Sequence, residues 1–272
     1  MRVPRRARLW LAAAGLAGAL AGCATRPPAS QPAALAEYEA TNDPLEPFNR
    51  AMYAVNLRLD RYALRPAAEA YTHVLPAGVR TGIHNALANL AAPVKLGNDM
   101  LQGKPHHAGD TLMRFVINST IGGLGFFDVA TKLGYPDHDS DFGLTLAVWG
   151  AGSGPYLFLP LLGPGDPRDS SGRIVDIASD PLNYFGQGVG VTAASWSRFG
   201  LNLVDARAQY LGTFAQIRRT ALDPYATFRS LFRQHRDAQV EAAREPEQRT
   251  VPAWFPRPNA AKPAAAAPSS AR

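Results

Sequence analysis

Apolar residues recur at intervals of three or four positions in five stretches of the chain, which is the spacing of one face of an α-helix. We therefore expect helices over residues 48–62, 79–90, 108–119, 203–214 and 224–235. The second should end before Pro93, because an interior proline breaks the helical hydrogen-bond ladder. Pro105 and the pair Asp223-Pro224 suit the first turns of the third and fifth helices. Alternating polar and apolar residues are not evident, so the pattern predicts a mainly α-helical fold.

A longer apolar run has a different character. Residues 142–165 are 24 amino acids without a charge, which is long enough to span a bilayer. They include six glycines and three prolines, and in a helix interior each glycine costs about 1 kcal/mol and each proline about 3 kcal/mol relative to alanine. We therefore expect two short apolar pieces, 142–149 and 156–162, connected by a flexible joint at 150–155.

The N-terminus has the pattern of a bacterial lipoprotein signal. A basic start (Arg2 to Arg8) precedes an apolar run from Leu9 to Leu20 that is too short to span a bilayer comfortably. Leu20-Ala21-Gly22-Cys23 follows, with small residues before a thiol that can accept a lipid as a thioether. This order predicts that residues 1–22 are a signal peptide and that Cys23 is the lipidated N-terminus. Ala24, in place of an aspartate, favours the outer membrane.

Two interpretations of the apolar run remain open, namely buried core and insertion into one leaflet. Because lipidation holds the chain at a bilayer, we consider the run a candidate membrane-embedded segment. Its glycines either gate a lipid path or only permit a tight turn. The candidate hinge residues are Gly150, Gly152, Gly154 and Pro155, and the candidate lipid-contacting residues are Phe142, Leu144, Leu146, Trp149, Tyr156, Leu157, Phe158, Leu159, Leu161 and Leu162.

The ends of the chain differ in composition from its middle. Residues 23–35 are rich in Ala, Pro, Ser and Gln and are expected to form a flexible tether. Residues 36–250 form the helical body, and the Pro- and Ala-rich residues 251–272 are expected to be a disordered tail. Four of the 28 basic residues lie in the signal peptide, so the remainder has 28 − 4 = 24 basic against 22 acidic residues. A net charge of +2 gives little reason to expect nucleic-acid binding.

No catalytic, metal or cofactor site is evident. Ser153 lacks the lipase pattern Gly-x-Ser-x-Gly because residue 151 is alanine. Residues 136–143 begin like a calcium loop, but Phe142 and Val148 stand where an EF-hand needs glycine and glutamate, so we interpret them as a polar loop that caps the next helix. His106 and His107 are adjacent and would point about 100° apart on a helix, so they cannot bind one metal together.

Four sequence blocks carry a family resemblance. Residues 43–50 (DPLEPFNR), 114–130, 142–169 and 223–229 occur in the same order as in the MlaA (VacJ) lipoproteins, which the chain resembles over nearly the whole body. The third block, with Trp149-Gly150 and Gly154-Pro155-Tyr156, is the most unusual in composition. Pro47 departs from the commoner glycine.

The resemblance implies an all-α, ring-like body embedded in the periplasmic leaflet of the outer membrane, with an amphipathic central channel. Such proteins associate with trimeric porins and remove misplaced phospholipid from the outer leaflet. They pass it to a periplasmic carrier and an inner-membrane transporter, which maintains lipid asymmetry. They are not enzymes. A structural lipoprotein that braces an outer-membrane complex without moving lipid is the alternative, and a lipoprotein phospholipase would need a catalytic site that we do not find.

Overall fold

The fold is that of a computed structural model, which describes residues 28, 30–32, 35, 43–184 and 189–246. The predicted signal peptide, the lipidated Cys23, most of the predicted tether and the predicted tail lie outside these residues. The described part is mainly helical, as the sequence predicts. None of its helices combines the length and apolar character needed to cross a membrane.

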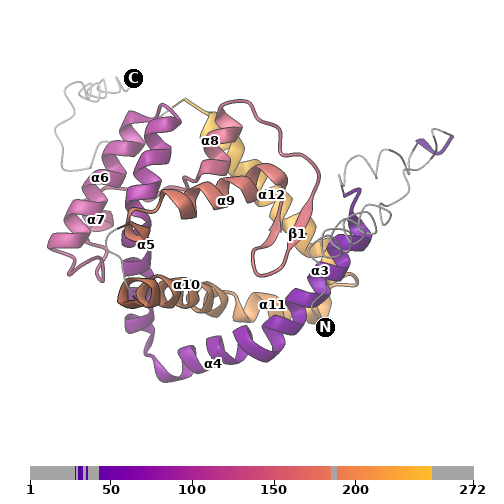
Figure 1. The fold of residues 1–272 in the computed structure, drawn as a ribbon, viewed down its shortest axis with the longest axis horizontal. Helices are drawn as coiled ribbons and strands as arrows, with labels where there is room; N and C mark the ends of the chain where they lie inside the picture. Colours follow the sequence, from indigo (N-terminus) through magenta and orange to yellow (C-terminus); the bar gives the residue numbers. More distant parts are fainter. Residues whose placement is uncertain (1–27, 29, 33–34, 36–42, 185–188, 247–272) are drawn as a thin grey trace, which may run out of the picture.

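The elements follow in this order: α3 (Glu46–Leu59), the π-helix η1 (Asp60–Leu64), α4 (Arg65–Val74), α5 (Ala77–Leu101), α6 (Pro105–Thr120), α7 (Val129–Lys132), α8 (Phe142–Val148), β1 (Leu157–Leu159), β2 (Gly163–Gly165), α9 (Pro167–Ser179), the 3-10 helix η2 (Pro181–Asn183), α10 (Val189–Gln209), α11 (Leu211–Thr220) and α12 (Pro224–Arg244). In Figure 1, α4 lies at the bottom, α5 and α6 stand side by side at the left, α8 and α12 lie at the top, and α3 lies at the right. Helices α9 and α10 run inside this outline.

Helix α5 is longer than the sequence predicted. The expected end before Pro93 is wrong, because α5 continues through this proline to Leu101. Packing against α6 along the helix stabilises it, since tertiary contacts outweigh intrinsic propensity. The Asn89 amide adds to this packing by donating a 2.8 Å hydrogen bond to Ser119 on α6.

The proline-marked helix starts are confirmed. Helix α6 begins at Pro105, and α12 begins at Pro224, with the Asp223 carboxylate accepting a 3.1 Å bond from the amide of Ala226. Asp141 caps α8 in the same way, at 2.8 Å from the amide of Leu144, as expected for the polar loop before it. The predicted helix over 203–214 is interrupted at Tyr210, between α10 and α11.

The expectation that strands are absent is wrong for one short hairpin. Strands β1 and β2 pair antiparallel, with Leu157 opposite Gly165 and Leu159 opposite Gly163. Both strands are short and β2 consists of glycine and proline, so they do not show the alternation of polar and apolar residues that marks a strand in a sequence. Side chains of α3 satisfy the free backbone of this hairpin: Asn49 bonds the carbonyl of Tyr156 at 3.0 Å and the amide of Phe158 at 2.8 Å.

Asn56, two helical turns after Asn49, repeats the arrangement at the far end of the hairpin. Its amide nitrogen donates to the carbonyl of Leu159 at 3.0 Å, and its oxygen accepts from the amide of Leu161 at 2.8 Å. Between the two asparagines, Tyr156 and Phe158 are buried against Tyr225 of α12. The hairpin is therefore fixed between α3 and α12.

A π-helical turn joins α3 to α4 without a break. In η1 the amide of Arg65 bonds the carbonyl of Asp60, five residues back. Pro66 follows and lacks an N–H, and in an α-helix its ring would clash with the carbonyl of Tyr62. The wider turn accommodates it. The Asp60 side chain is held by Arg207 of α10 at 2.6 Å.

One buried arginine connects three helices. Arg236 of α12 makes two hydrogen bonds to Asp141, each 2.8 Å long, and two to Asp169 of α9, at 2.8 and 2.9 Å. Burial raises the pKa of Asp141, but the Arg236 guanidinium and the backbone amides of Leu144 and Gly143 together outweigh burial and hold that pKa below its usual value. A Cβ at Gly143 would lie 2.6 Å from the Arg236 guanidinium, and one at Gly172 would lie 2.4 Å from the Gly143 amide. Only glycines permit this approach of α8 to α9.

Replacing Arg236 with methionine should lower the free energy of unfolding by about 3 kcal/mol, because the buried Asp169 and the partly exposed Asp141 would lose the cation that they share. Thermal unfolding of the detergent-solubilised protein, followed by circular dichroism, measures this. Arg219→Met removes an exposed arginine of α11 and should change stability by less than about 0.5 kcal/mol. Equal stability of both variants would contradict the role of Arg236.

Candidate functional site

A cavity of about 670 Å³ lies between α5, α9, α10 and the hairpin. In Figure 1 these helices surround the left half of the central region. Most of the cavity wall is apolar, formed by Leu87, Ala91, Val94, Leu162, Ile177, Trp196 and Phe199. Its polar residues are Asp176, Asp180, Asn183, Ser195, Arg198 and Asn202. A cavity of this size and composition suits a small amphipathic molecule.

The apolar wall exposes large side chains that other parts of the protein do not cover. Trp196 is 69% exposed and Ile177 is 54% exposed, and both line the cavity. Trp196 and Phe199, one turn apart on α10, meet edge to face with ring centroids 6.1 Å apart. Exposed aromatic area of this kind is costly in water and is stabilised when an apolar ligand covers it.

The polar edge of the cavity is formed at the end of α9. Arg198 of α10 forms an ion pair with Asp180, which is buried and also accepts a 3.0 Å bond from the amide of Leu182. Asn183 donates to the carbonyl of Ile177 at 2.7 Å and so holds η2 against α9. The charged pair therefore lies beside the aromatic wall and is fixed by local backbone contacts.

A second carboxylate of the cavity, Asp176, lies on α9 one turn before Asp180. Asp176 accepts a 2.8 Å bond from Asn98 of α5 and a 3.1 Å bond from the amide of Phe142. Burial raises the pKa of Asp176, although both hydrogen bonds act against the rise. These contacts anchor α9 to α5 and to the start of α8.

Helix α5 separates this cavity from a more polar one of about 400 Å³ that lies towards α6. Ala91 lines both. In the second cavity, Lys95 is 2.5 Å from Asp137, and Arg114 is 3.2 Å from Asp128. Because its wall is mostly apolar and carries the Trp196–Phe199 pair, the first cavity is the better candidate for an amphipathic ligand.

The structure places the predicted hinge glycines in the connection between α8 and β1. Gly150 ends α8 with φ of 94°, and the next amide, of Ala151, bonds the carbonyl of Leu146 at 2.9 Å. This is the Schellman arrangement that favours glycine. Gly154 also has positive φ, 77°, whereas Gly152 does not and has open space around it. Neither these glycines nor Pro155 line the apolar cavity.

The predicted lipid-contacting residues divide into three groups. Leu144, Tyr156 and Phe158 are buried in protein core, so they contact side chains of α12 and α3 instead of lipid. Trp149 and Leu161 are exposed, and the half-buried members are Phe142, Leu146, Leu157, Leu159 and Leu162. Of the whole set, only Leu162 lines the apolar cavity.

The residues that form most of this cavity could not be predicted from the sequence. They come from α5, α9 and α10, which are far apart along the chain. The one local signal was the uncharged stretch 181–197, which contains Trp196 and is followed by Arg198 and Phe199.

Comparison with known proteins gives one consistent result. The family model described as MlaA lipoprotein matches residues 41–239. The chain is 36% identical over 227 residues to the intermembrane phospholipid transport system lipoprotein MlaA of Haemophilus influenzae, covering 82% of this chain and 86% of that protein. It is 34% identical over 205 residues to the protein of the same name from Escherichia coli, covering 74% and 79%.

A solved structure agrees with these relatives. It is described as the structural basis for maintenance of bacterial outer membrane lipid asymmetry, and it superposes with a TM-score of 0.62 at 34% identity. The match covers 73% of this chain and 98% of the other.

Filling the apolar cavity should prevent ligand binding. Asn202 of α10 lines it and is exposed, so Asn202→Trp should weaken binding of a fluorophore with a long alkyl chain roughly tenfold, or about 1.4 kcal/mol. Leu201→Trp, at the neighbouring position outside the lining, is the control and should bind normally. Fluorescence titration of the detergent-solubilised protein measures both, and unchanged binding by Asn202→Trp would exclude this cavity as the ligand site.

Proposed function

The chain belongs to the MlaA lipoprotein family, and on that premise we propose that the cavity between α5, α9 and α10 holds the phospholipid that it transports. The protein is an outer-membrane lipoprotein of intermembrane phospholipid transport, not an enzyme. The observation that carries the proposal is the uncovered aromatic wall of α10 beside the Arg198–Asp180 ion pair.

The two sides of the cavity match the two ends of a phospholipid. Acyl chains that cover Trp196, Phe199 and Ile177 would remove apolar surface from water, at about 25 cal/mol for each Å². The phosphate would lie near Arg198, whose guanidinium can bind phosphate oxygens in pairs. A charged headgroup buried without such a partner would be costly. Transport of this kind needs no nucleophile.

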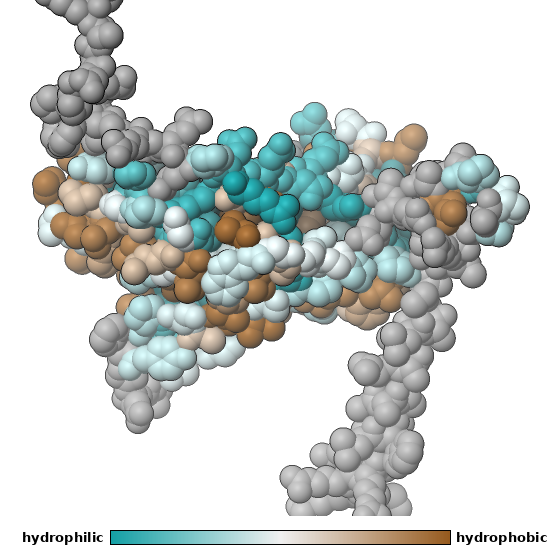
Figure 2. Space-filling view, turned by 90° about the horizontal axis from the view of Figure 1, so that it is seen from above, coloured by the Kyte–Doolittle hydropathy of each residue, from teal (hydrophilic) through white to brown (hydrophobic). Residues whose placement is uncertain are grey.

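The outer surface supports a position in the periplasmic leaflet of the outer membrane. Figure 2 shows hydrophilic residues gathered along one long side of the molecule, and hydrophobic patches among weakly polar residues over the rest of that view. Exposed apolar side chains include Leu112, Met113 and Val116 of α6. Such a surface is unusual for a protein that is surrounded by water.

Two leucines add to this support. Leu124 and Leu161 have positive φ, 59° and 64°, and are 79% and 57% exposed. A side chain at such a φ costs about 1–2 kcal/mol, and glycine avoids that cost. Leucine at both turns is therefore best explained if its side chain contacts lipid.

We extend the proposal to a ring-like body with an amphipathic central channel. The order of helices around the outline in Figure 1 and the cavity between α5, α9 and α10 support this arrangement. Acylated Cys23 and the tether would anchor the body. A trimeric porin would hold it at the outer membrane, and a periplasmic carrier would receive the phospholipid that it removes from the outer leaflet.

The outer-leaflet phospholipid content of living cells tests the function. Deletion should raise it, the wild-type gene should restore it, and Leu201→Trp should restore it as well. Asn202→Trp should fail to restore it although the protein is present at normal amounts. If Asn202→Trp restores asymmetry fully, the protein does not pass lipid through this cavity, and a structural role without lipid transfer becomes the better interpretation.

The glycines after α8 are proposed to gate lipid movement, and single substitutions separate gating from turn formation. Gly152 has open space and no positive φ, so Gly152→Ala should stiffen the joint without strain and raise outer-leaflet phospholipid at an unchanged melting temperature. Gly150→Ala and Gly154→Ala add strain of about 1 kcal/mol each and should lower the melting temperature.

The triple variant Gly150→Ala/Gly152→Ala/Gly154→Ala should lose asymmetry altogether. Normal lipid asymmetry in both Gly152→Ala and the triple variant would show that these glycines serve only the turn.

A further inference from the structure

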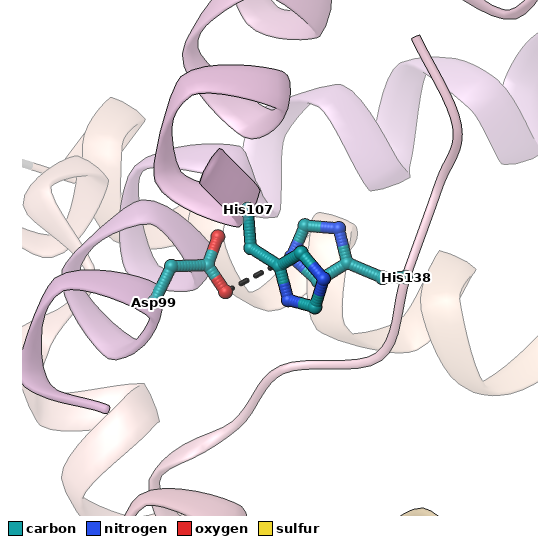
Figure 3. Close-up of side chains that lie close together, drawn as sticks. All are labelled: Asp99, His107 and His138. Atoms are coloured by element: carbon teal, nitrogen blue, oxygen red, sulfur yellow. Dashed lines mark hydrogen bonds and ion pairs between the residues drawn. The ribbon is translucent and has the colours of Figure 1, made fainter. Parts of the chain in front are cut away.

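A cluster of three metal-binding residue types lies outside the lipid cavity. Asp99 comes from the end of α5, His107 from the first turns of α6, and His138 from the loop before α8 (Figure 3). One potential ligand atom from each lies within 4.8 Å of the other two. We propose that these residues form a binding site for a divalent transition-metal ion such as Zn²⁺.

The carboxylate of the cluster is preorganised. Asp99 is fully buried. One of its oxygens accepts a 2.6 Å hydrogen bond from Thr111, which fixes the plane of the carboxylate, and the other lies 2.9 Å from Nε2 of His138. Carboxylates that bind metals are held by such outer hydrogen bonds, which orient the ligand oxygen.

The two imidazoles face each other. The rings of His107 and His138 stack with centroids 4.3 Å apart and planes inclined by 29°, and Figure 3 shows both beside the Asp99 carboxylate. Two nitrogens and one oxygen are a donor set that suits Zn²⁺ and its neighbours in the first transition series. Tetrahedral Zn²⁺ ligands at about 2.0–2.1 Å lie roughly 3.3 Å from one another, so the ligand atoms would move about 1–1.5 Å closer, and one imidazole would turn to point its in-plane lone pair at the ion.

The cluster is accessible from outside. His107 and His138 line a cavity of about 300 Å³ whose wall also includes His235 of α12 and Lys104. The amino group of Lys104 lies 3.4 Å from the carbonyl of Ala242. Water from this cavity would complete the coordination. A bound ion would fasten α5, α6 and the loop before α8 to one another.

In the competing interpretation, Asp99 and His138 form only a hydrogen bond, which holds the loop before α8 against α5. Titration of the full-length protein with ZnCl₂ separates the two. The protein is purified in detergent with a tag that lacks histidine, freed of metal with EDTA, and titrated by calorimetry. Co²⁺ replaces Zn²⁺ for visible absorption spectra. The proposal expects one ion for each chain, a tetrahedral Co²⁺ spectrum and a higher melting temperature with Zn²⁺.

Variants of the adjacent histidines provide the matched comparison. His107→Gln leaves the bond between His138 and Asp99 intact, and should weaken Zn²⁺ binding at least tenfold and abolish the melting-temperature shift. His106→Gln removes the exposed neighbour and should bind as the wild type does. His138→Gln should also lose the ion. Absence of saturable one-to-one binding in the wild type, or equal affinities of His107→Gln and His106→Gln, would overturn the proposal. Neither outcome bears on lipid transport.

Discussion

The burial of a single arginine cation decides how the C-terminal helix meets the middle of the chain. Arg236 needs carboxylates from both α8 and α9, because a buried guanidinium that lacked either would keep unsatisfied donors. Both carboxylates lie beside helix starts, Asp141 as the cap of α8 and Asp169 in the first turn of α9. The backbones of these two helices must therefore approach closely, which they do at Gly143 and Gly172.

The same arrangement fixes the position of α9, which forms one wall of the apolar cavity. Helix α9 is fixed at its start by Arg236 and farther along by Asp176, which bonds α5 and the first amide of α8. Its last turn then presents Ile177 to the cavity, and Asp180, directly after the helix, pairs with Arg198 of α10. The charged cluster that stabilises the body and the apolar cavity that we propose serves transport thus lie at successive positions along one helix.

The sequence predicted most of the helices because their apolar spacing and their prolines are local signals. Pro105 and Pro224 mark helix starts reliably, since a first-turn proline loses no hydrogen bond. The prediction that α5 ends before Pro93 was wrong, because packing against α6 stabilises a helix that propensity alone would end there. The hairpin was missed because Asn49 and Asn56, about a hundred residues away, supply its backbone partners. The cavity residues could not be predicted, because their proximity exists only after α5, α9 and α10 pack.

The π-turn at Asp60–Leu64 makes the outer helix sensitive to residue count. Relative to an ideal α-helix, it holds one extra residue, and each residue turns a helix by about 100°. Upstream of it α3 faces the hairpin, and downstream α4 faces α10, where Ala68 is buried. Losing one residue here would rotate every later side chain of α4 away from its neighbour. Natural variants of this exposed segment should therefore differ by substitutions, because an insertion or deletion of one residue would be selected against.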